Sequence, residues 1–167
     1  MFTQIFVSIL AFLLTIFPSW GALQYNYQLA SFDRDKTADS IVSAMNKQDI
    51  SALEAMICKN IKDNENDLPG KFGDMFDAVG GNISKYRLEN AGDFKYSNNG
   101  KRISQVGWDT YFSTTAGNFR MHILWEIAND FAPEETGIRR ILLMEGAPPH
   151  AEIMSIWATE GVFSAHD

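Results

Sequence analysis

An unbroken alternation of side chains between positions 119 and 127 constrains the fold more than any other feature of the sequence. Every second position carries a large apolar side chain: Phe119, Met121, Ile123, Trp125 and Ile127. The positions between them form a mixed face: Arg120, His122, Leu124 and Glu126. Because successive side chains of a strand point to opposite faces of a sheet, this segment is predicted to be a strand with one buried face.

Further strands are predicted on both sides of this segment. Residues 103–115 are rich in β-branched and aromatic side chains, and residues 83–88 and 138–145 are shorter candidates. Residues 92–100 are rich in glycine, serine and asparagine, which is typical of a turn. The pattern therefore predicts an antiparallel sheet of about four strands.

The connection between the two longest candidate strands sets which side chains face each other. The pair Gly117-Asn118 indicates a tight reversal. A turn centred there places Asp109 opposite Glu126 and Tyr111 opposite Leu124, with Gly107 as a candidate bulge.

Three helices are predicted before the sheet. Ala38, Ile41, Val42 and Met45 recur at helical spacing, and a second helix is expected from Asp49, with Ser51 and Glu54 spaced as a capping box. A third helix is expected between Pro69 and Gly80, because proline suits a first turn and glycine suits a helix end. The polar stretch 60–67 is predicted to be a loop.

The order of these elements predicts an α+β domain, in which two or three N-terminal helices pack on a curved, cone-like antiparallel sheet. We expect a single domain over residues 35–147, a leader over 22–34 and a tail over 148–167. Ile153, Ile156 and Trp157 are spaced as in a helix, which favours a short helix in the tail.

The N-terminal segment predicts export. No side chain from Phe2 to Phe17 is charged, Pro18 ends the apolar run, and small residues follow. This pattern is typical of a cleaved signal peptide over residues 1–21, and an uncleaved membrane anchor is the alternative. The predicted location is therefore periplasmic or secreted. No cysteine stands near residues 19–23, where a lipoprotein would need one.

Charge and cysteine content narrow the function classes. The net charge of −7 argues against a nucleic-acid partner, which selects clusters of lysine and arginine. Cys58 is the only cysteine, so no intramolecular disulfide can form, and its apolar surroundings predict a buried thiol. With His122 alone among the predicted strands, no metal cluster has recognisable spacing, and no cofactor is expected.

Residues 33–145 resemble a family of uncharacterised bacterial exported proteins and lipoproteins with a nuclear-transport-factor-2-like, or cystatin-like, cone fold. The resemblance rests on packing and turn residues: Ala38-Asp39-Ser40-Ile41, Asp49, Ala52, Leu53, Met56, Leu68-Pro69-Gly70-Lys71, Phe76-Asp77-Ala78, Gly81-Asn82-Ile83 and Trp108. It implies the cone fold and no particular activity, since the family has no assigned function.

The mixed strand face supplies the candidate catalytic residues Asp109, His122 and Glu126. A carboxylate beside an imidazole in an apolar pocket is a workable acid/base pair. The alternative is that His122 and Glu126 are solvated or satisfy each other on an open sheet face. Candidate ligand-binding residues are Trp108, Tyr111 and Arg139.

These observations favour an exported binding or interaction module for an unknown small ligand or protein. The alternative is a small acid/base enzyme of the ketosteroid-isomerase type, which would use a pocket on the concave sheet face. Cone folds host such sites, although a fold does not determine a function.

Overall fold

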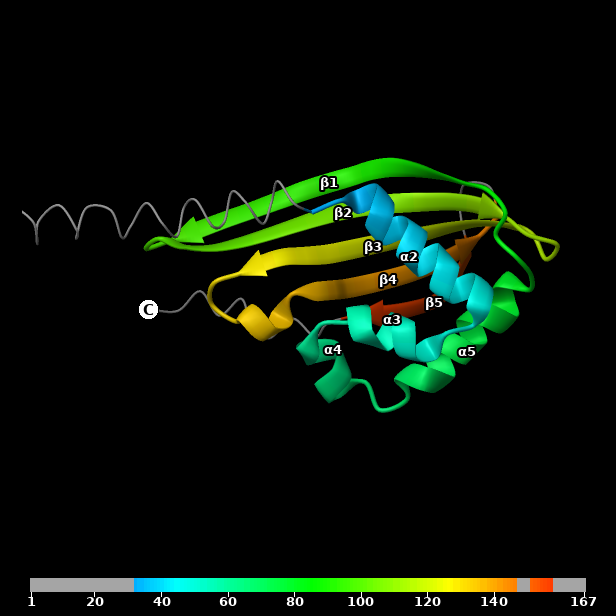
Figure 1. Cartoon of the computed structure of the whole chain (residues 1–167), viewed down its shortest axis with the longest axis horizontal. Coiled ribbons are helices and arrows are strands. Elements are labelled where there is room, and N and C mark those ends of the chain that lie inside the picture. Colours follow the sequence, from blue (N-terminus) through cyan, green and yellow to red (C-terminus); the bar gives the residue numbers. More distant parts are fainter. Residues whose placement is uncertain (1–31, 147–150, 158–167) are drawn as a thin grey trace, which may run out of the picture. The chain divides into compact units, whose positions relative to one another are not determined.

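The computed structural model describes residues 32–146 and 151–157, so the predicted signal peptide and nearly all of the leader lie outside the described residues. The helices are α2 (Arg34–Lys47), α3 (Ile50–Met56), α4 (Lys59–Asn64) and α5 (Leu68–Val79). The strands are β1 (Tyr86–Asn98), β2 (Lys101–Ser113), β3 (Asn118–Asn129), β4 (Gly137–Glu145) and β5 (Ala151–Trp157), with a short 3-10 helix η1 (Pro133–Glu135) before β4. The α+β prediction is confirmed (Figure 1).

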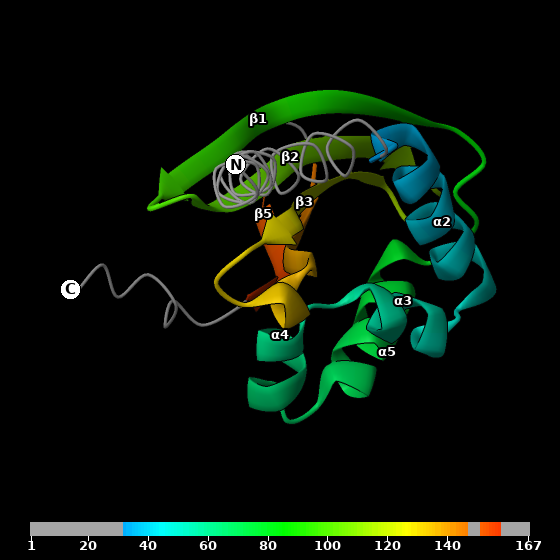
Figure 2. The same cartoon turned by 60° about the vertical axis from the view of Figure 1, so that its left-hand side comes forward.

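The sheet is an antiparallel meander in the order β1-β2-β3-β4-β5. One row of fully buried side chains runs across four of its strands: Trp108, Ile123, Ile141 and Ile156. Figures 1 and 2 show the helices on one side of the sheet. Tyr86 lies on the same face as the buried row, and its hydroxyl donates a hydrogen bond to Asp39 of α2. The core therefore lies between this row and the helices, and the row through Asp109 and His122 lies on the opposite face.

Helix α5 follows the sequence prediction closely. Asp67 caps its first turn, where the Gly70 backbone nitrogen donates to the Asp67 carboxylate over 3.0 Å. Gly80 ends it in the left-handed conformation, with φ of 53°. Its apolar stripe is buried as predicted: Leu68, Phe72, Met75, Phe76 and Val79.

The helical region departs from the prediction in two places. Helix α3 is capped by Asp49, whose side chain accepts from the Ala52 nitrogen over 2.9 Å, so Ser51 lies inside the helix and forms no capping box. The stretch predicted as a loop contains α4, whose start is held because the Asn60 nitrogen donates to Glu135 over 2.9 Å. Contact with a distant segment therefore supports a helix that local polarity disfavours.

The register between β2 and β3 differs from the prediction by four positions. Asp109 pairs with His122, Tyr111 pairs with Arg120, and Glu126 pairs with Gln105. The reversal is a longer loop over residues 114–117, in which the Thr114 nitrogen donates to the Gly117 carbonyl over 2.9 Å. The predicted turn at Gly117-Asn118 was therefore wrong.

Two threonine hydroxyls explain that loop. Thr114 Oγ1 donates to the Val79 carbonyl over 2.5 Å, and Thr115 Oγ1 donates to the Gly80 carbonyl over 2.7 Å. Carbonyls at a helix C-terminus lack intrahelical partners, so these bonds satisfy the end of α5. The same bonds hold the loop in place and fix the register of the hairpin.

The first and last strands extend the predicted sheet. Residues 92–98, predicted as a turn, belong to β1, and the turn itself is the pair Asn99-Gly100, both with positive φ. The bulge expected at Gly107 lies instead on β1, between Asn90 and Gly92. The tail forms β5 rather than a helix, because Ile156 pairs with Ile141 and completes the buried row.

Candidate functional site

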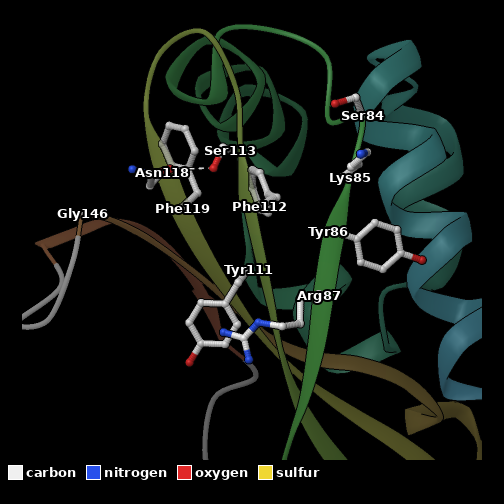
Figure 3. Close-up of a pocket in the computed structure, with 10 residues that line it drawn as sticks. All are labelled: Ser84, Lys85, Tyr86, Arg87, Tyr111, Phe112, Ser113, Asn118, Phe119 and Gly146. Carbon is white, nitrogen blue, oxygen red and sulfur yellow. Dashed lines mark hydrogen bonds between the residues drawn. The ribbon is translucent and has the colours of Figure 1, made fainter.

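An open groove of about 870 Å³ lies where β1 begins and the β2–β3 hairpin turns (Figure 3). Ten residues line it: Ser84, Lys85, Tyr86, Arg87, Tyr111, Phe112, Ser113, Asn118, Phe119 and Gly146. The rings of Phe112 and Phe119 stack at 5.4 Å and are buried, so they form a rigid base for this end of the sheet. The groove therefore combines a packed aromatic support with polar and basic side chains.

Tyr111 contacts two guanidinium groups at this groove. The Arg87 carbon Cζ lies 4.6 Å from the centre of the Tyr111 ring, and that of Arg120 lies 5.9 Å from it. Figure 3 shows Arg87 and Tyr111 side by side, while Tyr86 points away towards α2. A cation above a tyrosine face is favoured by the ring quadrupole, so the ring holds both arginines near the groove.

Asp109, two positions before Tyr111 on β2, contacts both Arg120 and His122. Arg120 Nη2 donates to Asp109 Oδ2 over 2.8 Å, and His122 Nδ1 lies 2.9 Å from Asp109 Oδ1. The Asp109 side chain is only 8% exposed, and that of His122 is 19% exposed. The hydrogen bond to Asp109 raises the pKa of the Arg120 guanidinium.

This geometry suits two kinds of chemistry. A carboxylate on Nδ1 orients the imidazole and leaves the far ring nitrogen, Nε2, to meet a ligand or carry a proton. Arg120 also donates to Asp109 and gives this carboxylate a permanent cationic partner. Such a charge-assisted hydrogen bond holds the side chains in place, which suits a fixed binding surface as well as it suits an acid/base pair. The arrangement is therefore able to bind an anion and to orient a histidine.

Glu126 lies in a separate buried cluster further along β3. Its carboxylate accepts from Gln105 Nε2 over 2.7 Å and from Asn129 Nδ2 over 2.5 Å. Arg139 Nη1 lies 3.4 Å from Glu126 and 3.7 Å from Glu135. Glu126 is 1% exposed and Arg139 is 8% exposed. One arginine thus serves two buried carboxylates, and we call these five residues the Glu126 cluster.

Cys58 lies beside this cluster at the junction of α3 and α4. Its backbone nitrogen donates to the Ile138 carbonyl over 3.0 Å, and its side chain is fully buried, as predicted. Burial raises the pKa of the Cys58 thiol, with nearby Glu135 adding to the rise. Gly137 permits this close approach, because an added Cβ would lie 2.6 Å from the Met56 carbonyl oxygen.

The structure brings together some of the sequence-predicted site residues and separates others. Asp109 contacts His122, and Tyr111 reaches the groove, whereas Glu126 pairs with Arg139 in the other cluster. The predicted Asp109–Glu126 pair does not form, because the register places Gln105 opposite Glu126. Trp108 is fully buried in the core, on the face of β2 opposite to Asp109.

Sequence reasoning missed the basic residues of the groove. Lys85, Arg87 and Arg120 were not singled out, although Arg87 and Arg120 both pair with Tyr111 across neighbouring strands. A hairpin loop of four residues would have revealed the Arg120–Tyr111 pair. Nothing in the local pattern of residues 103–120 distinguishes that loop from the shorter turn.

Within residues 32–146 and 151–157, no helix is long and apolar enough to cross a membrane. In the same ranges, no three His, Cys, Asp or Glu side chains are grouped to hold a metal ion.

No curated protein matches the chain. A family model described as a domain of unknown function, DUF5104, matches residues 40–146, from α2 to the end of β4. The chain therefore belongs to the DUF5104 family.

Proposed function

We propose that the protein is an exported binding module that holds a small anionic ligand with a planar group in the groove beside Tyr111. One observation carries this proposal: two guanidinium groups lie near a single tyrosine ring at the groove, with their central carbons 4.6 and 5.9 Å from the ring centre. Guanidinium groups recognise carboxylates and phosphates through paired hydrogen bonds, and an aromatic face favours a planar ligand.

The charges around the groove support an anion. Lys85 and Arg87 line it, and Arg120 lies next to it, in a chain whose net charge is −7. Arg87 also pairs with Glu89, but both side chains are largely exposed, at 62% and 46%. An exposed ion pair contributes little and is readily exchanged for a ligand. Asp109 is already engaged by Arg120 and His122, so its charge is compensated.

Export is the second part of the proposal. It rests on the uncharged apolar run that ends at Pro18, and the resemblance to exported proteins with a cone fold points the same way. Expression in a secreting bacterial host should give a mature protein that begins near Ala22. N-terminal sequencing of the exported fraction tests this, and an intact Met1 there would contradict cleavage.

Binding is tested with benzoate, which joins a carboxylate to a planar ring, and with benzamide as its neutral analogue. We expect benzoate to shift the amide resonances of Arg87 and Tyr111 saturably in two-dimensional NMR titrations. Arg87→Gln should weaken binding by about tenfold, because it removes a hydrogen bond from a charged donor. Lys101→Gln, at the far end of β2, is the matched control and should leave affinity unchanged.

A titration with inorganic phosphate under the same conditions shows whether the groove prefers a phosphate or a carboxylate. Equal affinity for benzamide and benzoate, or an Arg87→Gln variant that binds as well as the wild type, would contradict the proposal.

The acid/base enzyme remains the second candidate because Asp109 orients His122 over 2.9 Å. Its test is the incorporation of solvent deuterium next to the carbonyl of acetophenone. The enzyme hypothesis requires incorporation by the wild type and its loss in His122→Gln. Benzoate binding with no deuterium incorporation would leave the binding module as the function.

A further inference from the structure

Strand β1 is an edge strand of the sheet, and its second half has the features of an interface. It is hydrogen bonded to β2 on one edge, and its residues from Glu89 to Asn98 are all exposed. The bulge between Asn90 and Gly92 divides the strand, and the part after it, Gly92–Asn98, pairs with β2 without any further shift. An edge of this kind offers a row of backbone donors and acceptors for another strand.

Exposed aromatic side chains gather at the same end of the sheet. The described residues contain four exposed large hydrophobic side chains, and three of them lie here: Phe94 at 45%, Tyr96 at 37% and Phe131 at 41%. The Tyr96 and Phe131 ring centres are 6.3 Å apart, and Lys101 Nζ lies 5.3 Å from the Phe131 ring centre. Clustered aromatic residues with a basic rim are typical of a protein–protein interface.

The sequence of this half-strand is complementary to itself. Asp93 and Lys95 flank Phe94 and have the same orientation, since they pair with Val106 and Ser104 two positions apart on β2. Neither forms an ion pair within the described residues. In an antiparallel pair of two copies centred on Phe94, Asp93 stands opposite the partner's Lys95, and Lys95 stands opposite the partner's Asp93.

We propose that a second copy of this chain pairs with β1 through Gly92–Tyr96, on a twofold axis at Phe94. The two sheets then join edge to edge, which is the self-complementary arrangement that a twofold symmetric dimer requires. Two identical charge pairs form, and Tyr96 covers the partner's Gly92, a cross-strand contact that favours glycine opposite an aromatic ring.

The charge pattern selects this partner over an unrelated strand. An unrelated strand would need the same Asp-x-Lys order at the same spacing to pair antiparallel in this way, whereas a second copy supplies it by symmetry. The contact buries less surface than a standard interface, which buries roughly 1,600 Å². The dimer is therefore expected to be weak, with a dissociation constant in the micromolar range.

Charge reversal at two positions tests the proposal on the full chain. Asp93→Lys makes both facing positions basic, and Lys95→Asp makes both acidic, so each variant alone should be monomeric. We expect the dimer dissociation constant to rise by about tenfold or more in each, because two favourable pairs become repulsive. Sedimentation velocity over a concentration series measures the change.

Mixing the two variants provides the decisive measurement. In a mixed dimer every facing pair again joins a lysine to an aspartate, so the equimolar mixture should recover the dimer that neither variant forms alone. Asp74→Lys, an exposed change on α5, is the control and should dimerise like the wild type. A monomeric wild type, or a mixture that stays monomeric, would overturn the proposal.

The proposed dimer contact is separate from the proposed ligand groove. The groove lies at the Arg87 and Tyr111 end of the β1–β2 hairpin, and the aromatic patch lies at the Asn99-Gly100 end. Benzoate binding should therefore be the same in the charge-reversal variants as in the wild type.

Discussion

Replacing Arg139 with methionine should lower the free energy of unfolding by about 3–5 kcal/mol, which is the usual penalty for breaking a buried ion pair from one side. Arg139 is the cation next to both Glu126 and Glu135, and all three side chains are at most 9% exposed. Without it, two carboxylates remain buried with only neutral donors. Urea unfolding at neutral pH, followed by circular dichroism, measures the loss.

Two further variants provide a control for the Arg139→Met substitution and a partial rescue of it. Lys62→Met changes an exposed cation on α4 and should alter the free energy of unfolding by less than about 0.5 kcal/mol. Adding Glu126→Gln to Arg139→Met removes one buried charge and should restore part of the lost stability. If Arg139→Met costs no more than Lys62→Met, the Glu126 cluster does not contribute to stability as the geometry implies.

Replacing Phe76 with alanine should cost about 3–5 kcal/mol, because Phe76 is 7% exposed and its removal leaves a cavity under α5. Asp77 is the next residue along the helix and is exposed. Asp77→Ala should therefore change the free energy of unfolding by less than about 0.5 kcal/mol. Thermal or urea unfolding of the two variants gives the comparison, and equal losses would mean that the helix is rotated from the described orientation.

The elements that the sequence predicted best have strong local signals. Helix α5 combines a regular apolar stripe with Pro69 at its start and Gly80 at its end, and each signal indicates the same boundaries. Strand β3 alternates over most of its length, and its face with Met121 and Ile123 is buried as expected. Trp125 was expected in the core and is only half-buried.

The elements that were missed depend on distant contacts. Helix α4 is supported by Glu135, and β5 is defined by its pairing with β4 rather than by its own spacing of isoleucines. In β1, the residues after the bulge look like a turn because Gly92, Ser97 and Asn98 are common in turns. Local composition cannot distinguish an exposed edge strand from a loop.

The candidate site was predicted in part for the same reason. Asp109, Tyr111, His122 and Glu126 were predicted to share one face because alternation alone determines the face. Their partners depend on the register, and the register depends on a loop whose length the local sequence does not fix. The register error of four positions made Glu126 the predicted neighbour of Asp109 in place of Arg120 and His122. The sequence therefore predicted a repulsive environment for Asp109, whereas the structure gives it a cationic one.

The bonds from Thr114 and Thr115 to the end of α5 also bear on the order of folding. The β2–β3 hairpin has close sequence neighbours, yet the contacts that select its register lie 35 residues earlier in the chain. We therefore expect the register of the hairpin to be fixed only once α5 has formed and docked against it. Helix and hairpin should consequently acquire their native structure as one cooperative unit, and we expect the closure of the chain between them to be the slow step.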